Sequence, residues 1–542
     1  MNPERSLPNV LQSRTLAYVF LLLVIVFFAL IRYRLRDMPL ERDEGEYALS
    51  GQLMLQGIPP YTLAYNLKLP GTYASYAAIM AVFGETPAGI HLGFLLVNAI
   101  TILLMYILGA RLFGRWAGVV AAASYALLSA SPSILGFQAH ATHFIVLPAL
   151  VSILLLLYAV ESWNPWLFAA SGLFAGIAFL MKQHGIFVPV FCVLYLIVNA
   201  RKRQCGPREI VRQAMWLTVG IILPCATTVG LLYRAGVFRQ FWFWTVSYAG
   251  EYSKMGLRRG IRVFLQNFHA VAAPSALLWL LAALGILVLS YSPSARKHSF
   301  FLIALMLLAF LAICPGVQFR PHYFVLLLPP VSLLAAVAIS AATEILLERR
   351  KSSYLVALPC VVFLVCFAST IFQLRTFYFD LTPDQALAAA YPTDSRIFLA
   401  APQIAGYVRE HSSPSSQIAV IGSEPEIYFY AHRLPATGFI YMYSLTERQK
   451  YTDQMRQQMI HEVEANRPEY LIYVDAWDSW GYQRPAAPHV VALFSWAKDY
   501  TRDHYDRVGV ADLRHPFDIL WGDTAKTYNR SGDLIYVFRR RQ

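Results

Sequence analysis

An acidic cluster follows the first long apolar stretch of the chain, at Glu41-Arg42-Asp43-Glu44-Gly45-Glu46-Tyr47. Carboxylates close to a bilayer are energetically costly and are generally retained there for a function. A carboxylate that is ionised at neutral pH can accept a proton from a hydroxyl or amine nucleophile. Asp43 and Glu44 are therefore candidate general bases, and the sequence leaves open which of them acts. The alternative is a helix start, because the helix dipole favours acidic residues in the first turn.

A second group of residues supplies positive charge suited to phosphate. Lys68 stands in Lys68-Leu69-Pro70-Gly71, immediately before a short apolar segment, and an ammonium group binds phosphate as a point charge. The guanidinium group of Arg320 can clamp phosphate oxygens in a fork. Contact with lipid headgroups is the alternative for such side chains. The candidate donor-binding residues are Lys68, Lys182, Arg258, Arg259, Arg320 and His322.

Histidines form a third group of candidates. The spacing of His140 and His143 could suit a metal ion, but the sequence supplies no evident third ligand. We therefore expect neither a metal ion nor an organic cofactor. His143 and Glu46 are instead candidates for an acceptor contact or a secondary role.

The composition indicates that these residues belong to a polytopic membrane protein. The chain has 542 residues, of which 57% are hydrophobic and 14% charged, whereas soluble proteins carry about 25% charged residues. The net charge of +13 does not indicate a nucleic-acid partner, because the basic residues are scattered at helix ends. Apolar stretches of suitable length predict about eleven transmembrane helices. They are expected at residues 15–33, 88–109, 115–131, 143–160, 166–181, 185–200, 214–233, 271–291, 299–314, 323–345 and 354–374.

Loop charges predict the orientation of the chain. With the N-terminus inside, the predicted inner loops hold basic runs such as Arg201-Lys202-Arg203 and Arg349-Arg350-Lys351, in agreement with the positive-inside rule. An odd number of helices then places the acidic cluster and the C-terminal part of the chain outside. Two outer segments are unexpectedly basic, which indicates either headgroup contacts or attraction of an anionic lipid-linked substrate. They are Arg32–Arg36 and residues 234–262.

We predict two domains. Residues 1–375 form the transmembrane domain, with a first outer loop at 34–87, and residues 376–542 form a soluble α/β domain on the outer face. In the loop, Thr72–Phe83 is too short to span a bilayer and is expected as a helix in the outer interface. The C-terminal domain shows a polar helix-like segment and three β-like runs, without a nucleotide-binding motif. These segments are Thr446–Glu464, Gln417–Ile421, Tyr470–Val474 and Leu534–Phe538.

Several short motifs occur in an order that resembles a known family. They are Asp43–Ala48, Asn66–Pro70, Gly84, Gly176–Lys182 and Arg320–Pro330. In this order they resemble the GT-C membrane glycosyltransferases, most closely the protein O-mannosyltransferase-like family (glycosyltransferase family 39), which includes the bacterial lipid A aminoarabinose transferase. The resemblance implies a GT-C fold, a polyprenyl-phosphate sugar donor and an inverting displacement at the anomeric carbon.

The resemblance also implies roles for individual residues. Asp43 would be the base and Lys68 the contact to the donor phosphate, with Lys182 and Arg320 as secondary contacts. Glu46 departs from the family pattern, which often has Arg at this position. The family's Lys-Pro-Pro is Lys68-Leu69-Pro70 here. These departures bear on the identity of the sugar and the acceptor.

The function expected from these observations is that of an inverting hexosyl- or pentosyltransferase in a bacterial cytoplasmic membrane. It would move a sugar from a polyprenyl-phosphate donor to a lipid, glycan or protein acceptor on the outer face. A transporter or flippase of lipid-linked glycans is one alternative, but it should place charges near the bilayer midplane or show repeated halves. A non-catalytic membrane scaffold is another, but it would leave the polar outer loops without a role. The sequence identifies neither the sugar nor the acceptor.

Overall fold

The computed structural model describes residues 13–251, 257–349, 351–481, 486–514 and 517–541. The chain divides into two compact units, each built from separate stretches of sequence. The helical unit contains residues 1–36, 91–228 and 255–381, and the α/β unit contains residues 37–90, 229–254 and 382–542. The α/β unit therefore combines the C-terminal residues with most of the first predicted outer loop.

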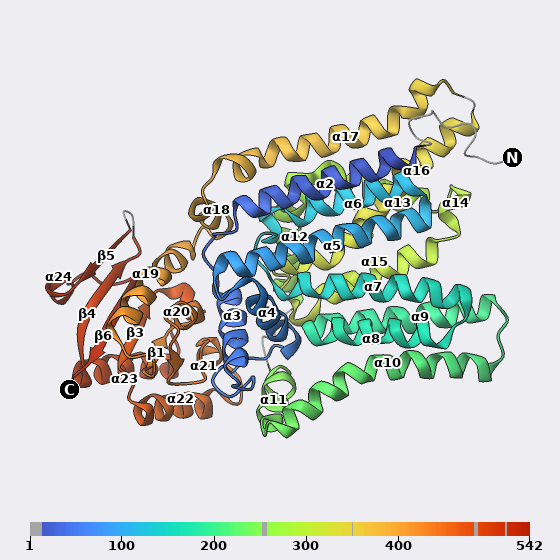
Figure 1. Cartoon of the computed structure of the whole chain (residues 1–542). Coiled ribbons are helices and arrows are strands. Elements are labelled where there is room, and N and C mark those ends of the chain that lie inside the picture. Colours follow the sequence, from blue (N-terminus) through green and yellow to red (C-terminus); the bar gives the residue numbers. More distant parts are fainter. Residues whose placement is uncertain (1–12, 252–256, 350, 482–485, 515–516, 542) are drawn as a thin grey trace. The chain divides into compact units, whose positions relative to one another are not determined.

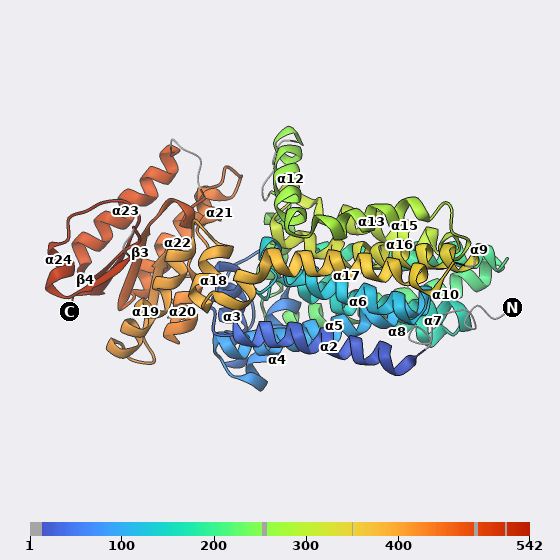
Figure 2. The same cartoon turned by 90° about the horizontal axis from the view of Figure 1, so that it is seen from above.

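Most of the helices in the helical unit are apolar and lie side by side along a common direction, whereas α12 (Leu257–Ala272) runs across this direction (Figures 1 and 2). Eight described helical segments are long and apolar enough to cross a membrane, and two further apolar helices are shorter. By their length and composition, these segments indicate a multi-pass membrane protein. The main helices are α2 (Arg14–Arg34), α5 (Pro87–Phe113), α6 (Arg115–Ser129), α7 (Ala141–Ser162), α8 (Pro165–Met181), α9 (Phe187–Lys202), α10 (Pro207–Arg234), α12 (Leu257–Ala272), α13 (Ala276–Val288), α15 (Ser299–Ile313), α16 (Leu328–Glu348) and α17 (Ser353–Arg375).

Every predicted span coincides with a helical segment in this part of the structure. The helices α9 and α13 belong to the longer continuous segments Gln183–Lys202 and Arg258–Val288, whereas three other helices are short. The helices α8 and α15 have 17 and 15 residues, and α6 has 15. A helix needs about 20 residues to cross the hydrocarbon region. The exact number of spans therefore stays a prediction.

Two arginines in the last turn of α2 bind the protein itself. Arg32 is buried and donates hydrogen bonds to Asn98 Oδ1, the Ser129 carbonyl and the Gly136 carbonyl, at 3.2, 3.0 and 2.8 Å. Arg34 donates to carbonyl groups of Phe377, Tyr378 and Leu381, after the end of α17. The expected headgroup or substrate contact is therefore not supported for Arg32, because its guanidinium is buried among these acceptors, whereas for Arg34 it stays a prediction.

A six-stranded mixed sheet forms the core of the α/β unit, with the order β2-β1-β3-β6-β4-β5. β1 is parallel to β2 and β3, whereas the pairs that involve β6 and β5 are antiparallel. The strands are β1 (Gln417–Ile421), β2 (Leu434–Pro435), β3 (Tyr470–Asp475), β4 (Tyr505–Asp512), β5 (Asp518–Trp521) and β6 (Leu534–Arg540). The helices of this region are α18 (Pro383–Ala390), α19 (Ser395–His411), α20 (Pro425–Ala431), α21 (Tyr443–Thr446), α22 (Thr452–Asn466), α23 (Pro488–His504) and α24 (Asp523–Thr527).

The three predicted strands correspond to β1, β3 and β6, with almost the same bounds. The predicted helix at 446–464 begins later, at Thr452, because α21 and a short connection precede it. The strands β2, β4 and β5 were not predicted from the sequence. β4 combines buried residues with Asp506 and Arg507, so it lacks the apolar character of a buried strand.

The predicted first outer loop contributes two helices to this unit. They are α3 (Arg42–Leu55) and α4 (Pro70–Phe83). α4 begins with Pro70 at its first position, where a missing N–H costs nothing, and ends at Gly84, whose φ of 91° favours glycine. The predicted helix at 72–83 is therefore confirmed, whereas its place in the membrane interface stays a prediction. α11 (Phe238–Trp242) and a π-helical turn (Phe243–Tyr248) complete the unit.

Candidate active site

The acidic cluster is the start of α3. The Glu41 carboxylate caps this helix and accepts hydrogen bonds from the backbone N–H groups of Asp43 and Glu44, at 3.0 and 2.8 Å. The interpretation as a helix start is thus confirmed. The helix also brings two carboxylates together, because residues three apart on a helix lie on the same face. Asp43 and Glu46 are therefore neighbours.

Lys68 bridges these two carboxylates. Its Nζ lies 2.9 Å from Asp43 Oδ1 and 2.7 Å from Glu46 Oε2. The Tyr61 hydroxyl donates to the Lys68 carbonyl at 2.7 Å and fixes the backbone before α4. The side chains of Glu46, Lys68 and Asp43 are 0%, 12% and 23% exposed, respectively. Asp43 is therefore the carboxylate of this group that solvent reaches best.

The charges of this group depend on one another. Burial by itself would lower the pKa of Lys68, but the Asp43 and Glu46 carboxylates outweigh it and raise that pKa well above its usual value. Lys68 is therefore an ammonium ion at physiological pH. Burial also raises the pKa of Glu46, which Lys68 and a hydrogen bond from the Tyr73 hydroxyl counteract. Glu46 thus serves as the buried counter-ion of Lys68.

Aromatic side chains complete the surroundings of Lys68. Its Nζ lies 4.5 Å from the ring centre of Tyr47, a distance at which cation–π attraction is significant. The Tyr73 hydroxyl donates to Glu46 Oε1 at 2.6 Å, and the Tyr441 hydroxyl donates to Asp43 Oδ1 at 2.8 Å. Neighbouring Glu44 is fully buried. This difference in exposure favours Asp43 over Glu44 as a base.

Arg42 anchors the start of α3 to the sheet. Its guanidinium donates to the Ser423 carbonyl at 2.7 Å and lies 3.3 Å from Glu424 Oε1 and 3.4 Å from Asp394 Oδ2. Ser423 and Glu424 follow β1 directly, at the carboxyl end of the parallel strands. The Ser479 hydroxyl, which follows β3, donates to Glu424 at 2.8 Å. The sheet therefore fixes the helix that carries Asp43.

Lys182, His184 and His322 lie within the helical unit. Lys182 is buried, with its Nζ 4.4 Å from the ring centre of Tyr323. The His184 ring packs on the same tyrosine, and the rings of His140 and His322 stack with centres 4.1 Å apart. The structure thus gathers an ammonium group and imidazoles around Tyr323.

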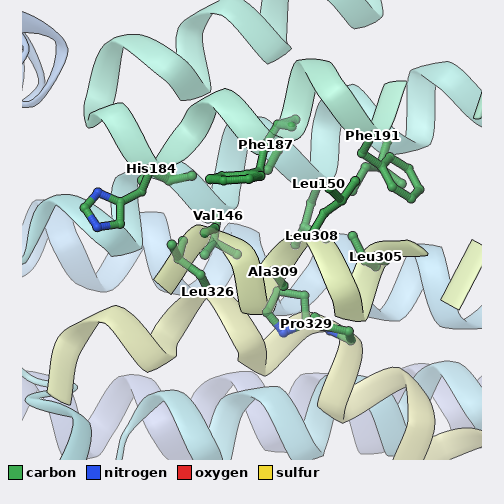
Figure 3. A pocket seen from close by; sticks show the side chains of 16 residues that line it. Val146, Leu150, His184, Phe187, Phe191, Leu305, Leu308, Ala309, Leu326 and Pro329 are labelled. Atoms are coloured by element: carbon green, nitrogen blue, oxygen red, sulfur yellow. The ribbon is translucent and has the colours of Figure 1, made fainter. Parts of the chain in front are cut away.

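An apolar cavity of about 70 Å³ begins at His184. Figure 3 shows the imidazole at one end of the cavity, followed by a series of apolar side chains from several helices. Along its length the cavity is lined by residues such as Val146, Phe187, Leu308 and Pro329. A polar end joined to an apolar cavity suits a ligand with a polar head and a hydrocarbon chain.

The other predicted residues are three exposed arginines and one buried histidine. Arg320 is exposed, and its Nε donates to Gln318 Oε1 at 3.0 Å. Arg258 and Arg259 are exposed at the start of α12. His143 is buried against the Phe94 ring, and its nitrogens have no hydrogen-bond partner among the residues that the structure describes.

Sequence reasoning missed Arg42, Tyr73 and Tyr441. The first two stand inside segments that the sequence singled out, but the buried partners of Arg42 lie more than 350 positions away. Tyr441 is separated from Asp43 by 398 positions. A single sequence carries no signal for such a pairing.

Residues 69–231 match the family model described as dolichyl-phosphate-mannose-protein mannosyltransferase. The comparison with curated protein sequences finds no match.

The similarity to solved structures covers more of the chain than the family match does. The structure of ArnT from Cupriavidus metallidurans bound to undecaprenyl phosphate is 16% identical with a TM-score of 0.55, and the alignment covers 85% of this chain and 94% of ArnT. Its apo structure is 15% identical with a TM-score of 0.53 and the same coverage. The oligosaccharyltransferase AglB from Archaeoglobus fulgidus, in complex with an inhibitory peptide and a dolichol-phosphate, is 14% identical with a TM-score of 0.49, over 94% of this chain and 75% of AglB. The family match and the ArnT fold confirm the predicted resemblance to GT-C membrane glycosyltransferases.

Proposed function

We propose that this multi-pass chain, which resembles the GT-C membrane glycosyltransferases in its family match and its fold, transfers a sugar from a polyprenyl-phosphate donor to a lipid, glycan or protein acceptor. The observation that carries the proposal is the pairing of a solvent-accessible carboxylate, Asp43, with the buried ammonium group of Lys68. Such a pair supplies a base for the acceptor and a positive charge close to the reacting centre.

The proposed reaction is a single in-line displacement. Asp43 takes the proton from an acceptor hydroxyl or amine, and the acceptor atom forms the new bond to the anomeric carbon. The bond between that carbon and the phosphate oxygen breaks, and the electron pair leaves with the polyprenyl phosphate. Attack from the side opposite the leaving group inverts the anomeric configuration. Lys68, Lys182 and Arg320 are the proposed contacts that stabilise the charge on the phosphate.

The apolar cavity supports a lipid-linked donor. Its polar end is close in sequence to Lys182, and its lining offers hydrocarbon contacts. The structure of ArnT with undecaprenyl phosphate supports the same donor class. His322 is proposed to assist phosphate binding, whereas Arg258 and Arg259 are proposed to attract the anionic lipid headgroup from the membrane surface.

Two other functions receive less support. A flippase of lipid-linked glycans needs no base, and a non-catalytic scaffold needs no buried counter-ion that fixes Lys68. The proposed location is a bacterial cytoplasmic membrane, with the N-terminus inside and the acidic cluster and sheet outside.

Replacement of Asp43 tests the proposal. The full chain is reconstituted in proteoliposomes with undecaprenyl-phosphate mannose or aminoarabinose and an envelope extract as the acceptor source. Asp43→Asn should abolish the release of undecaprenyl phosphate, whereas replacing the exposed Asp37 by Asn should not. Undiminished release by the folded Asp43→Asn variant would refute the assigned role. Translocation of the donor without its consumption would instead identify a flippase.

A further inference from the structure

One loop of the α/β unit is held against the first outer loop. It comprises residues 436–442, directly after β2. The Tyr65 N–H donates to the Gly438 carbonyl at 2.7 Å. A Cβ on Gly438 would lie only 2.4 Å from the Tyr65 ring, so the two segments approach as closely as a glycine permits.

Glu462 of α22 fixes this contact from the other side. Its carboxylate accepts hydrogen bonds from the Tyr65 hydroxyl at 3.2 Å, the Thr437 hydroxyl at 2.7 Å and the Gly438 N–H at 3.1 Å. One carboxylate therefore holds both loops. Hydrogen bonds to an ionised acceptor are among the strongest in proteins, so the loop is well positioned when it reaches α3.

The loop places the Tyr441 hydroxyl on Asp43. The hydroxyl donates to Oδ1 at 2.8 Å, and the same oxygen receives Lys68 Nζ at 2.9 Å. Burial and the Asp43 charge raise the pKa of Tyr441 well above its usual value. The phenol therefore keeps its proton and acts as a donor to the carboxylate.

We propose that Tyr441 is a positioning residue for the base Asp43, so that the C-terminal α/β segment completes the catalytic site. This inference rests on the proposed function. Two donors on one carboxylate oxygen restrict rotation of the group and hold it in one orientation, and small displacements of a reacting group are costly in rate. The C-terminal segment thus contributes directly to the catalytic geometry.

The other charged groups near Tyr441 also belong to the α/β unit. The ring lies 5.7 Å from Lys68 Nζ and packs edge-on against Tyr443 at 5.6 Å. A hydrogen bond to an ionised carboxylate favours the ionised form, so its loss makes protonation of the base easier. The pH dependence of Tyr441 variants therefore includes contributions from every group whose charge acts on the Tyr441 hydroxyl. They are Asp43, Glu46, Glu41 and Arg42.

The test compares Tyr441→Phe with Tyr443→Phe in the full chain. The Tyr443 hydroxyl donates to the Asp478 carbonyl at 2.9 Å, so the control loses a similar hydrogen bond away from Asp43. Release of undecaprenyl phosphate is measured between pH 5 and 9 with the donors named above. Tyr441→Phe should lower kcat roughly tenfold and leave the donor KM within about twofold. The pH of half-maximal activity on the acidic side should rise by about one unit. Tyr443→Phe should follow the wild type.

Each outcome has a distinct meaning. Wild-type kinetics and an unchanged pH profile in Tyr441→Phe, with Asp43→Asn inactive, overturn the inference and leave the proposed function intact. A lower activity with an unchanged profile and a lower thermal stability also overturns it, because a structural role explains that result. A wild-type chain that releases no undecaprenyl phosphate from either donor overturns the proposed function, and the inference falls with it.

Discussion

Gly45 of α3 lies directly against Glu426 of α20. A Cβ built on Gly45 would be 2.6 Å from both the Cβ and the backbone nitrogen of Glu426. Because real Cβ atoms do not approach backbone so closely, only glycine permits this packing of the two helices. The contact sets how α3, with Asp43 and Glu46, sits on the sheet.

Gly45→Ala should therefore displace α3 and reduce activity. A shift of about 1 Å at a catalytic group can cost roughly 100-fold in rate, and overpacking costs about 1–3 kcal/mol of stability. Activity and thermal unfolding of the variant are compared with those of Gly406→Ala, since a Cβ on Gly406 in α19 meets nothing within 4 Å. Equal activities of the two variants would show that the α3–α20 contact does not position the site.

Glu426 itself should make stability depend on pH. It is fully buried, and neither carboxylate oxygen has a hydrogen-bond partner among the described residues. Burial raises its pKa well above the usual value, and nearby Glu424 adds to this. The folded state then binds a proton that the unfolded state releases above about pH 4.3, so the stability falls as the pH rises toward the folded-state pKa.

Glu426→Gln should remove this decrease in folding stability at higher pH. Its apparent Tm should match the wild type near pH 4.5 and exceed it by roughly 2–4 °C at pH 8. Differential scanning fluorimetry in detergent measures both values, with replacement of the exposed Glu410 by Gln as control. A Tm difference that is constant with pH would contradict the argument.

Local patterns in the sequence predicted much of this structure. Apolar stretches indicated the helices, and short apolar runs indicated β1, β3 and β6, because burial on a helix or strand leaves a local record in hydropathy. The acidic residues and Lys68 were predicted as a site, and the structure joins Lys68 to Asp43 and Glu46. Helix periodicity explains why both carboxylates face the same lysine.

Long-range partners could not be predicted in this way. Arg42 stands in the acidic cluster and had no predicted role, yet it pairs with the fully buried Glu424 after β1. The same limit applies to Arg32, whose acceptors are the Asn98 side chain and two backbone carbonyls that no sequence pattern marks. Arg320 is exposed and donates to Gln318, so its assignment as a phosphate contact stays a prediction.

Lys68→Met should abolish transfer. The variant keeps much of the side-chain volume but removes the charge beside Asp43, with an expected loss of about 100-fold or more in kcat. It also leaves Glu46 buried without its counter-ion, which should destabilise the protein by about 3 kcal/mol. The double variant Lys68→Met/Glu46→Gln should recover stability in thermal unfolding but not activity. Recovery of activity would show that Lys68 is a structural residue only.

Chelation should leave the reaction unaffected. The proposed donor is a phosphate diester whose charge Lys68, Lys182 and Arg320 can balance, so the mechanism does not require a divalent ion. Release of undecaprenyl phosphate should be equal before and after EDTA treatment followed by gel filtration. Activity that is lost with EDTA and restored by a divalent cation would overturn this part of the proposal.

Lys182→Ala should weaken donor binding more than it slows the displacement. Lys182 is buried beside Tyr323, close in sequence to the His184 end of the apolar cavity. A hydrogen bond to a charged group contributes about 1.5–3 kcal/mol, so its loss should raise the donor KM at least tenfold. The exposed Lys297 provides the matched control, because Lys297→Ala removes the same charge away from the cavity. A fall in kcat with an unchanged donor KM would instead indicate that Lys182 acts only in the transition state.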